Sequence, residues 1–256
     1  MNMPNWKSWD FSPTGLARVV LITAVGTLGT MAVALAAVSY TTRFMAPDAA
    51  TLTFAASVAI PLIMSGPILY FFASKLRENA LMHQQLAWIA SQDSLTTCLN
   101  RGAFITLVDA YLSQINAPQS VHGGFLVIDA DHFKDINDRF GHAVGDQALQ
   151  LIVGAVKGTL RSTDLLGRIG GEEFAVLLPQ ASLAHARTVA ERIRDNVAVI
   201  EFCRDGQDVP LTVSIGGVQF GAPVGFNELH VAADQRLYQA KRLGRNRVEF
   251  SSLSTN

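Results

Sequence analysis

Charged residues and cysteine are both scarce in this sequence. Only 16% of its 256 residues are Asp, Glu, Lys or Arg, the formal net charge is -1, and 49% of the residues are hydrophobic. Without a run of basic residues, the chain gives no support for binding nucleic acid. Its two cysteines, Cys98 and Cys203, have no neighbours at metal-ligand spacing, so we expect neither a disulfide framework nor a zinc site. Internal repeats and low-complexity segments are also missing.

Two long uncharged stretches lie near the N-terminus, at residues 19–40 and 49–74. Each is long enough to cross a hydrocarbon core, which takes about 20 apolar residues. We therefore expect a membrane region at 1–74, with transmembrane helices at about 19–40 and 50–73. Two alternatives remain open, namely two buried helices of a soluble protein and cleavage of the first stretch as a signal peptide.

Basic residues flank these stretches on their outer sides, at Lys7, Arg18, Lys75 and Arg77. The connection between them, 41–48, contains only Arg43. Basic residues favour the cytoplasmic side of a membrane. The pattern therefore predicts a multi-pass protein of the cytoplasmic membrane with both termini in the cytoplasm.

The segment 75–92 has no glycine or proline and predicts a helical linker without a clean heptad repeat. From Asp93 onward, helical and strand-like patterns alternate, which indicates an α+β domain at 93–256. The expected helices are 102–116, 135–158, 183–199 and 227–243. The expected strands are 124–128, 211–220 and 247–250, together with a hairpin around residues 170–171.

That hairpin lies in the segment RIGGEEF at 168–174, between two apolar, strand-like runs. Gly170 and Gly171 predict a two-residue hairpin turn with positive φ. Glycines allow a bulky anion to approach the backbone, and Glu172 and Glu173 offer the oxygen ligands that Mg²⁺ prefers. The segment suits a metal-bound nucleoside triphosphate, although an ordinary exposed hairpin fits these residues equally well.

An acidic residue also follows the apolar run 125–128, at Asp129. At the end of a buried strand, Asp129 can share a metal ion with an acid of the hairpin. A helix is expected to begin just beyond, so backbone N–H groups there can bind phosphate, namely those of His132, Phe133 and Lys134. Asp131 fits the N-cap of this helix better than it fits a metal ligand.

Asn137 and Asp146 together match guanine. A carboxylate accepts from the ring N–H and the exocyclic amine, and an amide both donates and accepts along the same edge. Lys241, Arg245 and Arg247 surround Gly244 and are cations suited to the distal phosphates. Taken singly, the first two residues also fit loop or cap positions, and the cations fit a solvated helix end.

Taken together and in order, these motifs resemble the GGDEF-domain diguanylate cyclases from Asp93 to about Phe250. The segments that carry the resemblance are DSLTTCLNR at 93–101, DADHFKDIND at 129–138, GHAVGD at 141–146, GGEEF at 170–174, VSIG at 213–216 and DQRLYQAKRLGRNR at 234–247. The resemblance implies a ferredoxin-like palm that binds one GTP. Two domains in a homodimer would join two GTP into cyclic di-GMP and release pyrophosphate.

The resemblance also implies residue roles. Asp129 and Glu172 would ligate metal, with two Mg²⁺ per site or alternatively Mn²⁺. Glu173 would act at the reacting centre, as a ligand or by assisting deprotonation of the ribose 3′-hydroxyl. The substrate would contact Asn137 and Asp146 at guanine, and the backbone at His132, Phe133, Lys134, Gly170 and Gly171, with Lys241 and Arg245 at its phosphates. The chain departs from the family pattern at Thr97, Cys98 and Gly102, outside this set, and has Glu172 where the family name has Asp.

Arg161 and Asp164 lie shortly before the hairpin, Asp164 six positions before Gly170. In the family that it resembles, this pattern forms an inhibitory site for cyclic di-GMP, to which Arg192 would contribute from the following helix. A surface ion pair is the alternative. The function thus expected is a membrane-anchored, product-inhibited bacterial diguanylate cyclase, and the alternative is a catalytically silent receptor for GTP or cyclic di-GMP.

Overall fold

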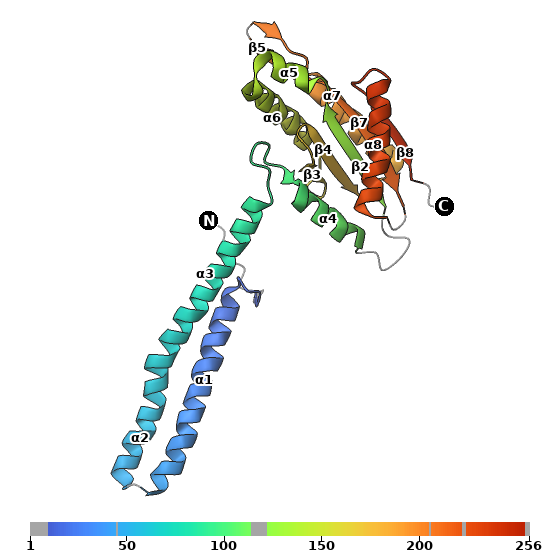
Figure 1. The fold of residues 1–256 in the computed structure, drawn as a ribbon. Helices are drawn as coiled ribbons and strands as arrows, with labels where there is room; N and C mark the ends of the chain where they lie inside the picture. The colour runs from blue at the N-terminus through green and yellow to red at the C-terminus, as the bar shows by residue number, and fades with distance from the viewer. Residues whose placement is uncertain (1–9, 45, 114–121, 205, 222–223, 254–256) are drawn as a thin grey trace. The chain divides into compact units, whose positions relative to one another are not determined.

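The computed structural model describes residues 10–44, 46–113, 122–204, 206–221 and 224–253 (Figure 1). The chain divides into two compact units, residues 1–89 and 90–256. Each unit is considered by itself.

The first unit is a hairpin of long helices. Helix α1 spans Leu16–Thr41 and is followed by a short 3-10 turn, η1, at Thr42–Phe44. The return arm consists of α2 at Pro47–Ile60, a π-helical turn, η2, at Pro61–Ser65, and α3 at Gly66–Ala90. Helix α3 covers most of the predicted linker and ends two residues before its expected end.

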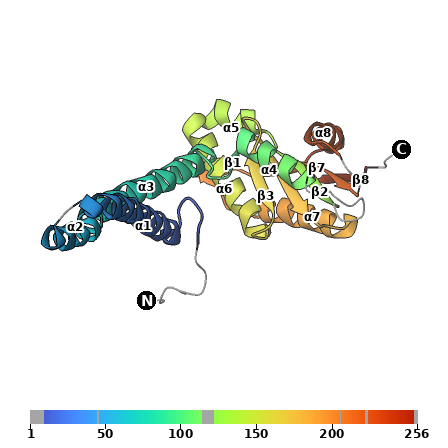
Figure 2. The ribbon, with the colours of Figure 1, turned by 90° about the horizontal axis from the view of Figure 1, so that it is seen from below.

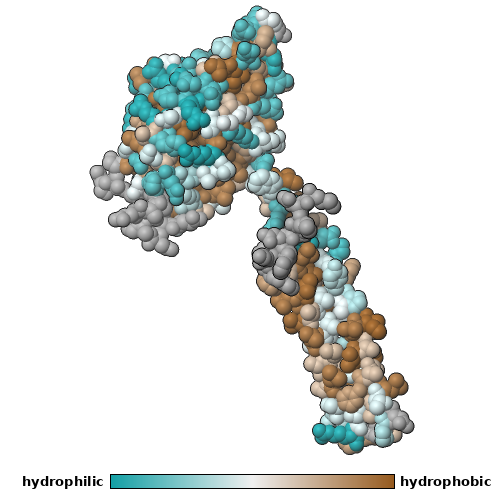
Figure 3. Space-filling view, turned by 180° about the vertical axis from the view of Figure 1, so that it is seen from behind, coloured by the Kyte–Doolittle hydropathy of each residue, from teal (hydrophilic) through white to brown (hydrophobic). Residues whose placement is uncertain are grey.

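Apolar side chains cover much of the outside of this hairpin (Figure 3). Two helical stretches, Leu16–Phe44 and Ala49–Ala90, have mean hydropathies of 2.2 and 1.8, and only 6% and 11% of their most apolar windows is buried. Core helices of a soluble protein bury such residues. The structure therefore does not support the buried-core alternative, and the two stretches are candidate membrane spans.

The second unit is built on a six-stranded sheet in the order β1-β3-β4-β2-β7-β8. Central strand β2, Gly123–Ala130, is antiparallel to β4, Glu173–Pro179, and to β7, Val213–Phe220. The other strands of the sheet are β1 at Leu99–Asn100, β3 at Leu165–Arg168 and β8 at Val248–Ser252. The order β3-β4-β2-β7 is that of the expected ferredoxin-like palm. A separate two-stranded ribbon pairs β5, Cys203–Arg204, with β6, Gln207–Asp208.

Five helices cover the sheet, with α8 and α7 on opposite sides (Figure 2). They are α4 at Arg101–Ser113, α5 at Phe133–Phe140, α6 at His142–Thr159, α7 at Leu183–Ala198 and α8 at Phe226–Arg242. Phe125 and Val127 of β2 share one core with α4 and α8, while Leu126 and Ile128 share the other with α5, α6 and α7. Alternate residues of a strand face opposite sides, so a strand buried on both faces is apolar throughout.

The single helix predicted at 135–158 was wrong, because α5 and α6 are separate helices. The chain breaks at Gly141, whose φ of 83° is readily available to glycine and ends the right-handed helix. The short strands β1, β5 and β6 were not predicted either. The predicted helix 102–116 corresponds to α4, and residues 114–116 lie outside the described residues.

Candidate active site

The GGEEF segment forms a wider turn than the sequence predicted. Strand β3 ends at Arg168, which pairs with Phe174, and residues 169–172 connect it to β4. The N–H groups of Ile169 and Gly170 both donate to the carbonyl oxygen of Glu173, at 2.9 and 3.2 Å. Neither Gly170 nor Gly171 has a positive φ, which among the described glycines occurs only at 141, 206 and 244. The prediction of a two-residue turn was therefore wrong. The pairing of β3 with β4 stops at Arg168 and Phe174, so residues 169–172 form the connection and both N–H groups at its start bond to Glu173.

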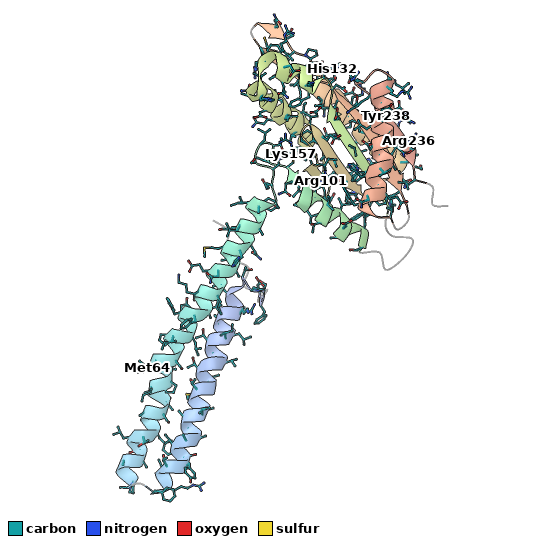
Figure 4. The ribbon with its side chains drawn as sticks, viewed as in Figure 1. Met64, Arg101, His132, Lys157, Arg236 and Tyr238 are labelled. Atoms are coloured by element: carbon teal, nitrogen blue, oxygen red, sulfur yellow. The ribbon has the colours of Figure 1, made fainter. Side chains whose placement is uncertain are left out.

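Two arginines hold this turn. The Nε and Nη2 groups of Arg168 donate to the carbonyl oxygen of Gly171, at 3.0 and 2.6 Å. Arg101, at the start of α4 (Figure 4), donates through Nη1 to the carbonyl oxygen of Ile169 at 3.1 Å. Arginines that bond to backbone carbonyls restrict the loop that carries them. The sequence analysis gave neither arginine a role.

Arg168 also connects the turn to the beginning of this unit. Its Nη1 lies 3.1 Å from Oδ1 of Asp93, which accepts from the N–H and the hydroxyl of Thr96 as well. Burial raises the pKa of Asp93, but the hydrogen bonds from Thr96 and the Arg168 guanidinium outweigh it and hold this pKa below its ordinary value. Asp93 and Arg168 are 75 residues apart in the chain, so their pairing could not be found from local spacing.

Three acidic residues meet at the same edge of the sheet. Asp129 ends β2 opposite Glu173 of β4, and the N–H of Ala130 donates to the carbonyl oxygen of Glu172 at 3.3 Å. Asp129 is only 5% exposed. Burial, together with the negative charges of Glu172 and Glu173, raises the pKa of Asp129 to about 6 against the opposing effect of Lys241. The structure thus places the three acidic residues that the sequence singled out at one edge of the sheet.

Lys241 lies on this acidic edge, with its Nζ 2.8 Å from Oδ2 of Asp129. It comes from α8, which packs directly on β7. The contact is so close that a Cβ added at Gly216 of β7 would lie 2.1 Å from the carbonyl oxygen of Ala233 of α8. The ammonium thus pairs with a predicted metal ligand. Among the described residues, no three His, Cys, Asp or Glu side chains converge closely enough to hold a metal ion.

Asp131 does not cap helix α5, contrary to the prediction. The N-cap is His132, in the left-handed conformation and without a side-chain cap bond. Asp131 is buried, and its carboxylate accepts three hydrogen bonds, from Thr212 Oγ1 at 2.9 Å, Ser214 Oγ at 2.7 Å and the N–H of Asn246 at 3.0 Å. The carboxylate lies among these donors of the neighbouring strand and turn, so it is not available to the first turn of α5.

The bond to Asn246 fixes the turn that carries Arg245. Three consecutive residues there have positive φ, 115° at Gly244, 61° at Arg245 and 45° at Asn246. Non-glycine residues adopt this conformation at a cost, so surrounding contacts must stabilise it. Asp131 supplies one such contact and places exposed Arg245 beyond the end of α8.

The backbone that was predicted to bind phosphate lies at the start of α5. The N–H groups of Asp135 and Ile136 donate to the carbonyl oxygen of His132, so Phe133 and Lys134 belong to the first turn. Backbone N–H groups of a first turn point outward and favour anions. The ring Nδ1 of His132 lies 3.1 Å from Oδ2 of Asp135, and both side chains are exposed (Figure 4).

The two predicted guanine ligands lie on either side of the break at Gly141. Asn137 belongs to α5, and its Oδ1 is buried without a hydrogen-bond partner. A Cβ at Gly145 would lie only 2.0 Å from this atom, so the amide packs against the backbone next to Asp146. Asp146 itself is exposed on α6. A buried amide oxygen without a partner is unusual, and this oxygen and the Asp146 carboxylate are both acceptors of the kind that the donors of a guanine edge require.

Arg161 and Asp164 form a closed turn of their own. The N–H of Arg161 donates to Oδ2 of Asp164 at 2.8 Å, and the N–H of Asp164 donates to the carbonyl oxygen of Arg161 at 3.1 Å. The side chain of Arg161 is exposed, as is that of Arg192 on α7. The alternative of an ion pair between these two side chains is not what the structure shows, because the Asp164 carboxylate contacts the backbone of Arg161 instead.

The second unit is similar in sequence to known proteins. The sequence matches the family described as "Diguanylate cyclase, GGDEF domain" over residues 90–247. It is 39% identical over 193 residues to the uncharacterised protein YhcK of Bacillus subtilis, covering 73% of this chain and 53% of YhcK. It is 42% identical over 165 residues to the diguanylate cyclase DgcP of Pseudomonas aeruginosa, covering 63% of this chain and 24% of DgcP. The chain thus spans about half of one relative and a quarter of the other.

Among solved structures, the coiled coil and GGDEF domain of DgcB from Caulobacter crescentus, in complex with c-di-GMP, is similar. The TM-score is 0.66 and the sequence identity 27%, and the match covers 72% of this chain and 98% of that one. The family match covers more than half of the chain and includes every element of the acidic edge. The chain belongs to the family of GGDEF-domain diguanylate cyclases.

Proposed function

We propose that this chain is a diguanylate cyclase, which condenses two GTP molecules into cyclic di-GMP and releases pyrophosphate. The observation that carries the proposal is the edge of the sheet at which Asp129, Glu172 and Glu173 meet. A domain that only binds nucleotide has no need for a full set of acids at this edge. The relative DgcP is described as a diguanylate cyclase, which supports the same activity here.

The three carboxylates fit a divalent cation. They offer hard oxygen ligands, and the Lys241 ammonium already lies 2.8 Å from Asp129, which marks this edge as a place for positive charge. Asp129, Glu172 and Glu173 would hold Mg²⁺ or Mn²⁺, two ions per site as the family resemblance implies. When bound, the metal would neutralise phosphate charge and favour the ionised 3′-hydroxyl.

The other predicted residues would orient GTP. Asn137 and Asp146 bind the guanine edge, which explains why the amide oxygen of Asn137 lacks a partner within the chain. The phosphates lie against the backbone of the first turn of α5 and of Gly170 and Gly171, and the space beside Gly171 is open. Two cations complete the phosphate site, Arg245 from its fixed turn and Lys241 once it leaves Asp129.

In the reaction, the 3′-oxygen of each GTP attacks the α-phosphorus of the other in two successive steps, and one pyrophosphate leaves in each step. A carboxylate oxygen of Glu173 accepts the proton of that hydroxyl. Because each domain holds one GTP, two domains must face each other, and a homodimer is the active species. Positioning and charge neutralisation then supply most of the rate enhancement.

Incubation of the purified full chain with GTP and Mg²⁺ tests this proposal. Chromatography should show cyclic di-GMP and pyrophosphate appearing together, and neither should form in EDTA. Binding of GTP without turnover would instead support the alternative of a catalytically silent receptor. Size-exclusion chromatography with light scattering during turnover would show whether active fractions are dimeric.

The chain organisation follows the sequence analysis. Residues 1–74 form a membrane region, 75–92 a helical linker and 93–256 the catalytic domain, anchored to the bacterial cytoplasmic membrane. The basic flanks place both termini in the cytoplasm, although Lys7 lies outside the described residues. A reporter that is active only outside the cytoplasm should be silent after Asn256 and active when inserted near Pro47. The reverse pattern would contradict the orientation.

Regulation by product is the last part of the proposal. Cyclic di-GMP would bind Arg161, Asp164 and Arg192 and hold two catalytic domains apart. The exposed guanidinium groups of Arg161 and Arg192 support this, since arginine can bind a phosphate through two hydrogen bonds. Asp164 would have to exchange its contact with the N–H of Arg161 for a guanine edge.

A further inference from the structure

A cavity of about 190 Å³ lies between the beginning of α1 and the middle of α3. Most of its lining is apolar, and two of its residues are arginines, Arg18 from α1 and Arg77 from α3. The apolar part includes Val19 and Ala73, which are 4% and 3% exposed. No acidic residue lines it. A site of this composition attracts a ligand that is anionic at one end and apolar at the other.

Both arginines are available to an anion. Arg77 uses its Nε to donate to the carbonyl oxygen of Thr14 at 2.6 Å, which holds the guanidinium in place in the lining of the cavity. Among the described residues, neither Arg18 nor Arg77 takes part in an ion pair. Two acids at this end of the hairpin are engaged elsewhere, since Asp10 accepts from Ser12 and Glu78 pairs with Lys75 at 2.7 Å.

The cavity lies where the hairpin would leave the membrane. Arg18 precedes the apolar residues of α1, and Arg77 follows those of α3 in the chain, so both belong to the same end of the two arms. Apolar residues, among them Ile22 and Leu76, line the cavity beside them. Basic pockets between membrane helices at the cytoplasmic surface suit anionic lipid headgroups.

We propose that Arg18 and Arg77 form a binding site for one anionic phospholipid. The phosphodiester is bound by the two guanidinium groups, and the first carbons of an acyl chain lie against Val19, Ile22 and Ala73. The proposal rests on the membrane anchoring of residues 1–74 and not on catalytic activity. A free phosphate shares the headgroup chemistry but leaves the apolar lining uncovered, so the occupant is a lipid.

Lipid binding to the delipidated full chain in a non-ionic detergent tests the site. Phosphatidylglycerol is titrated in, and bound lipid is counted by native mass spectrometry. We expect saturation at one lipid per chain, and weaker binding of phosphatidylcholine by about tenfold. Arg18→Gln should weaken phosphatidylglycerol binding by about tenfold, because one of the two guanidinium groups that bind the phosphodiester is lost. Among the residues that the structure describes, no hydrogen bond or ion pair of the Arg18 side chain is lost with it. Arg77→Lys, which keeps the charge but not the planar fork, should weaken it less than Arg77→Gln.

Lys75→Gln is the matched control, because it removes one positive charge at the same end of the hairpin but outside the cavity. It should bind phosphatidylglycerol as the wild type does. Equal losses in Lys75→Gln and Arg18→Gln would show attraction to a charged surface and would overturn the proposal. So would equal binding of the two lipids, or displacement of phosphatidylglycerol by millimolar inorganic phosphate. Membrane fractionation of the same variants checks anchoring independently of lipid choice.

Discussion

The two ends of the candidate active site are built differently. At the end of β2, Asp129 pairs with Lys241, and Asp131 accepts three hydrogen bonds within the chain. At the break between α5 and α6, the buried amide oxygen of Asn137 has no partner and Asp146 is exposed. Groups that perform chemistry must be held in place before substrate arrives, whereas groups that recognise a base need donors that only the ligand supplies. The acidic edge is thus held by contacts within the chain, whereas the proposed guanine end leaves an amide oxygen unpaired.

The largest expected effect is at the acidic edge. Glu173→Gln keeps the shape of the side chain but removes the proton acceptor, so cyclic di-GMP formation should fall at least about 100-fold. Glu173 is half-buried at the start of β4, so the melting temperature should change little. Glu201→Gln, at an exposed acid, is the control and should retain activity. Near wild-type synthesis by Glu173→Gln would contradict the role of this edge.

The next largest effect is expected at Asp131, whose carboxylate holds the turn of Arg245. Asp131→Asn places an amide where the carboxylate accepts from Thr212, Ser214 and Asn246, so at least one donor loses its partner. An unsatisfied buried donor costs about 2 kcal/mol, which urea unfolding would detect as a lower free energy of unfolding. Asp135→Asn, at an exposed site on α5, should leave this free energy unchanged. Equal stabilities of the two variants would show that Asp131 does not hold the turn of Arg245.

The contrast between local patterns and contacts of distant residues also separates what the sequence could predict from what it could not. The apolar run of β2 stops at Asp129, so local pattern alone placed this acid at a strand end and suggested that it shares a metal ion with an acid of the hairpin. The resemblance to a known family then named Glu172 as that ligand. Asp131 was misassigned because an acid just before a helix matches a cap, while its real partners lie 81 to 115 residues away. The pair formed by Lys241 and Asp129 likewise depends on how closely α8 packs at Gly216. Tertiary contacts of this kind leave no local signal.

The turn at Gly170 and the break at Gly141 show that the position of a glycine in the sequence does not by itself predict its backbone conformation. Two glycines between apolar runs usually mark a tight hairpin, but here β3 and β4 stop pairing at Arg168 and Phe174, which leaves a wider turn. In contrast, the positive φ of Gly141 separates α5 from α6 and so brings Asn137 beside Gly145. The residues of the guanine end were predictable from their chemistry, whereas the break that brings them together was not.

At the guanine end, removing the unpaired amide should weaken substrate binding without loss of stability. Asn137→Ala should raise the dissociation constant of GTP by about tenfold, because a ligand donor loses its acceptor. Binding measured with a non-hydrolysable GTP analogue checks this, and Asp138→Ala, exposed beside it, is the control. The unfolding free energy should stay the same or rise, since a buried oxygen without a partner is removed. A large loss of stability would mean that Asn137 serves the fold.

A smaller effect is expected from pH. Because the pKa of Asp129 is raised, metal affinity should depend on pH. Because this pKa is about 6, above the ordinary 3.8, the folded protein keeps a proton there that the unfolded chain has lost. In the metal-free protein, the contribution of Asp129 to stability therefore falls as the pH rises from about 4 to 6 and is constant above. Metal binds the ionised form, so affinity changes in the opposite direction.

Calorimetric titration with Mg²⁺ at two pH values measures this. Affinity should fall about fourfold between pH 7.5 and pH 5.5, since the ionised fraction of Asp129 drops over this interval. Proton release on binding, measured in buffers of different ionisation enthalpy, should be larger at pH 5.5. Equal affinities at the two pH values would show that Asp129 is already ionised throughout this range.

The smallest effect on initial rate is expected at the proposed inhibitory turn. In Arg161→Ala, the backbone N–H that donates to Asp164 is retained, so the turn and the acidic edge should stay intact. Initial rates should therefore equal those of the wild type. Slowing of the reaction as cyclic di-GMP accumulates should disappear, because a guanidinium that binds product phosphate is gone. Arg187→Ala, an exposed arginine on the same helix as Arg192, is the control and should still be inhibited. If Arg161→Ala and the wild type gave the same progress curves with added cyclic di-GMP, the turn would have only a structural role, and product would have to act elsewhere.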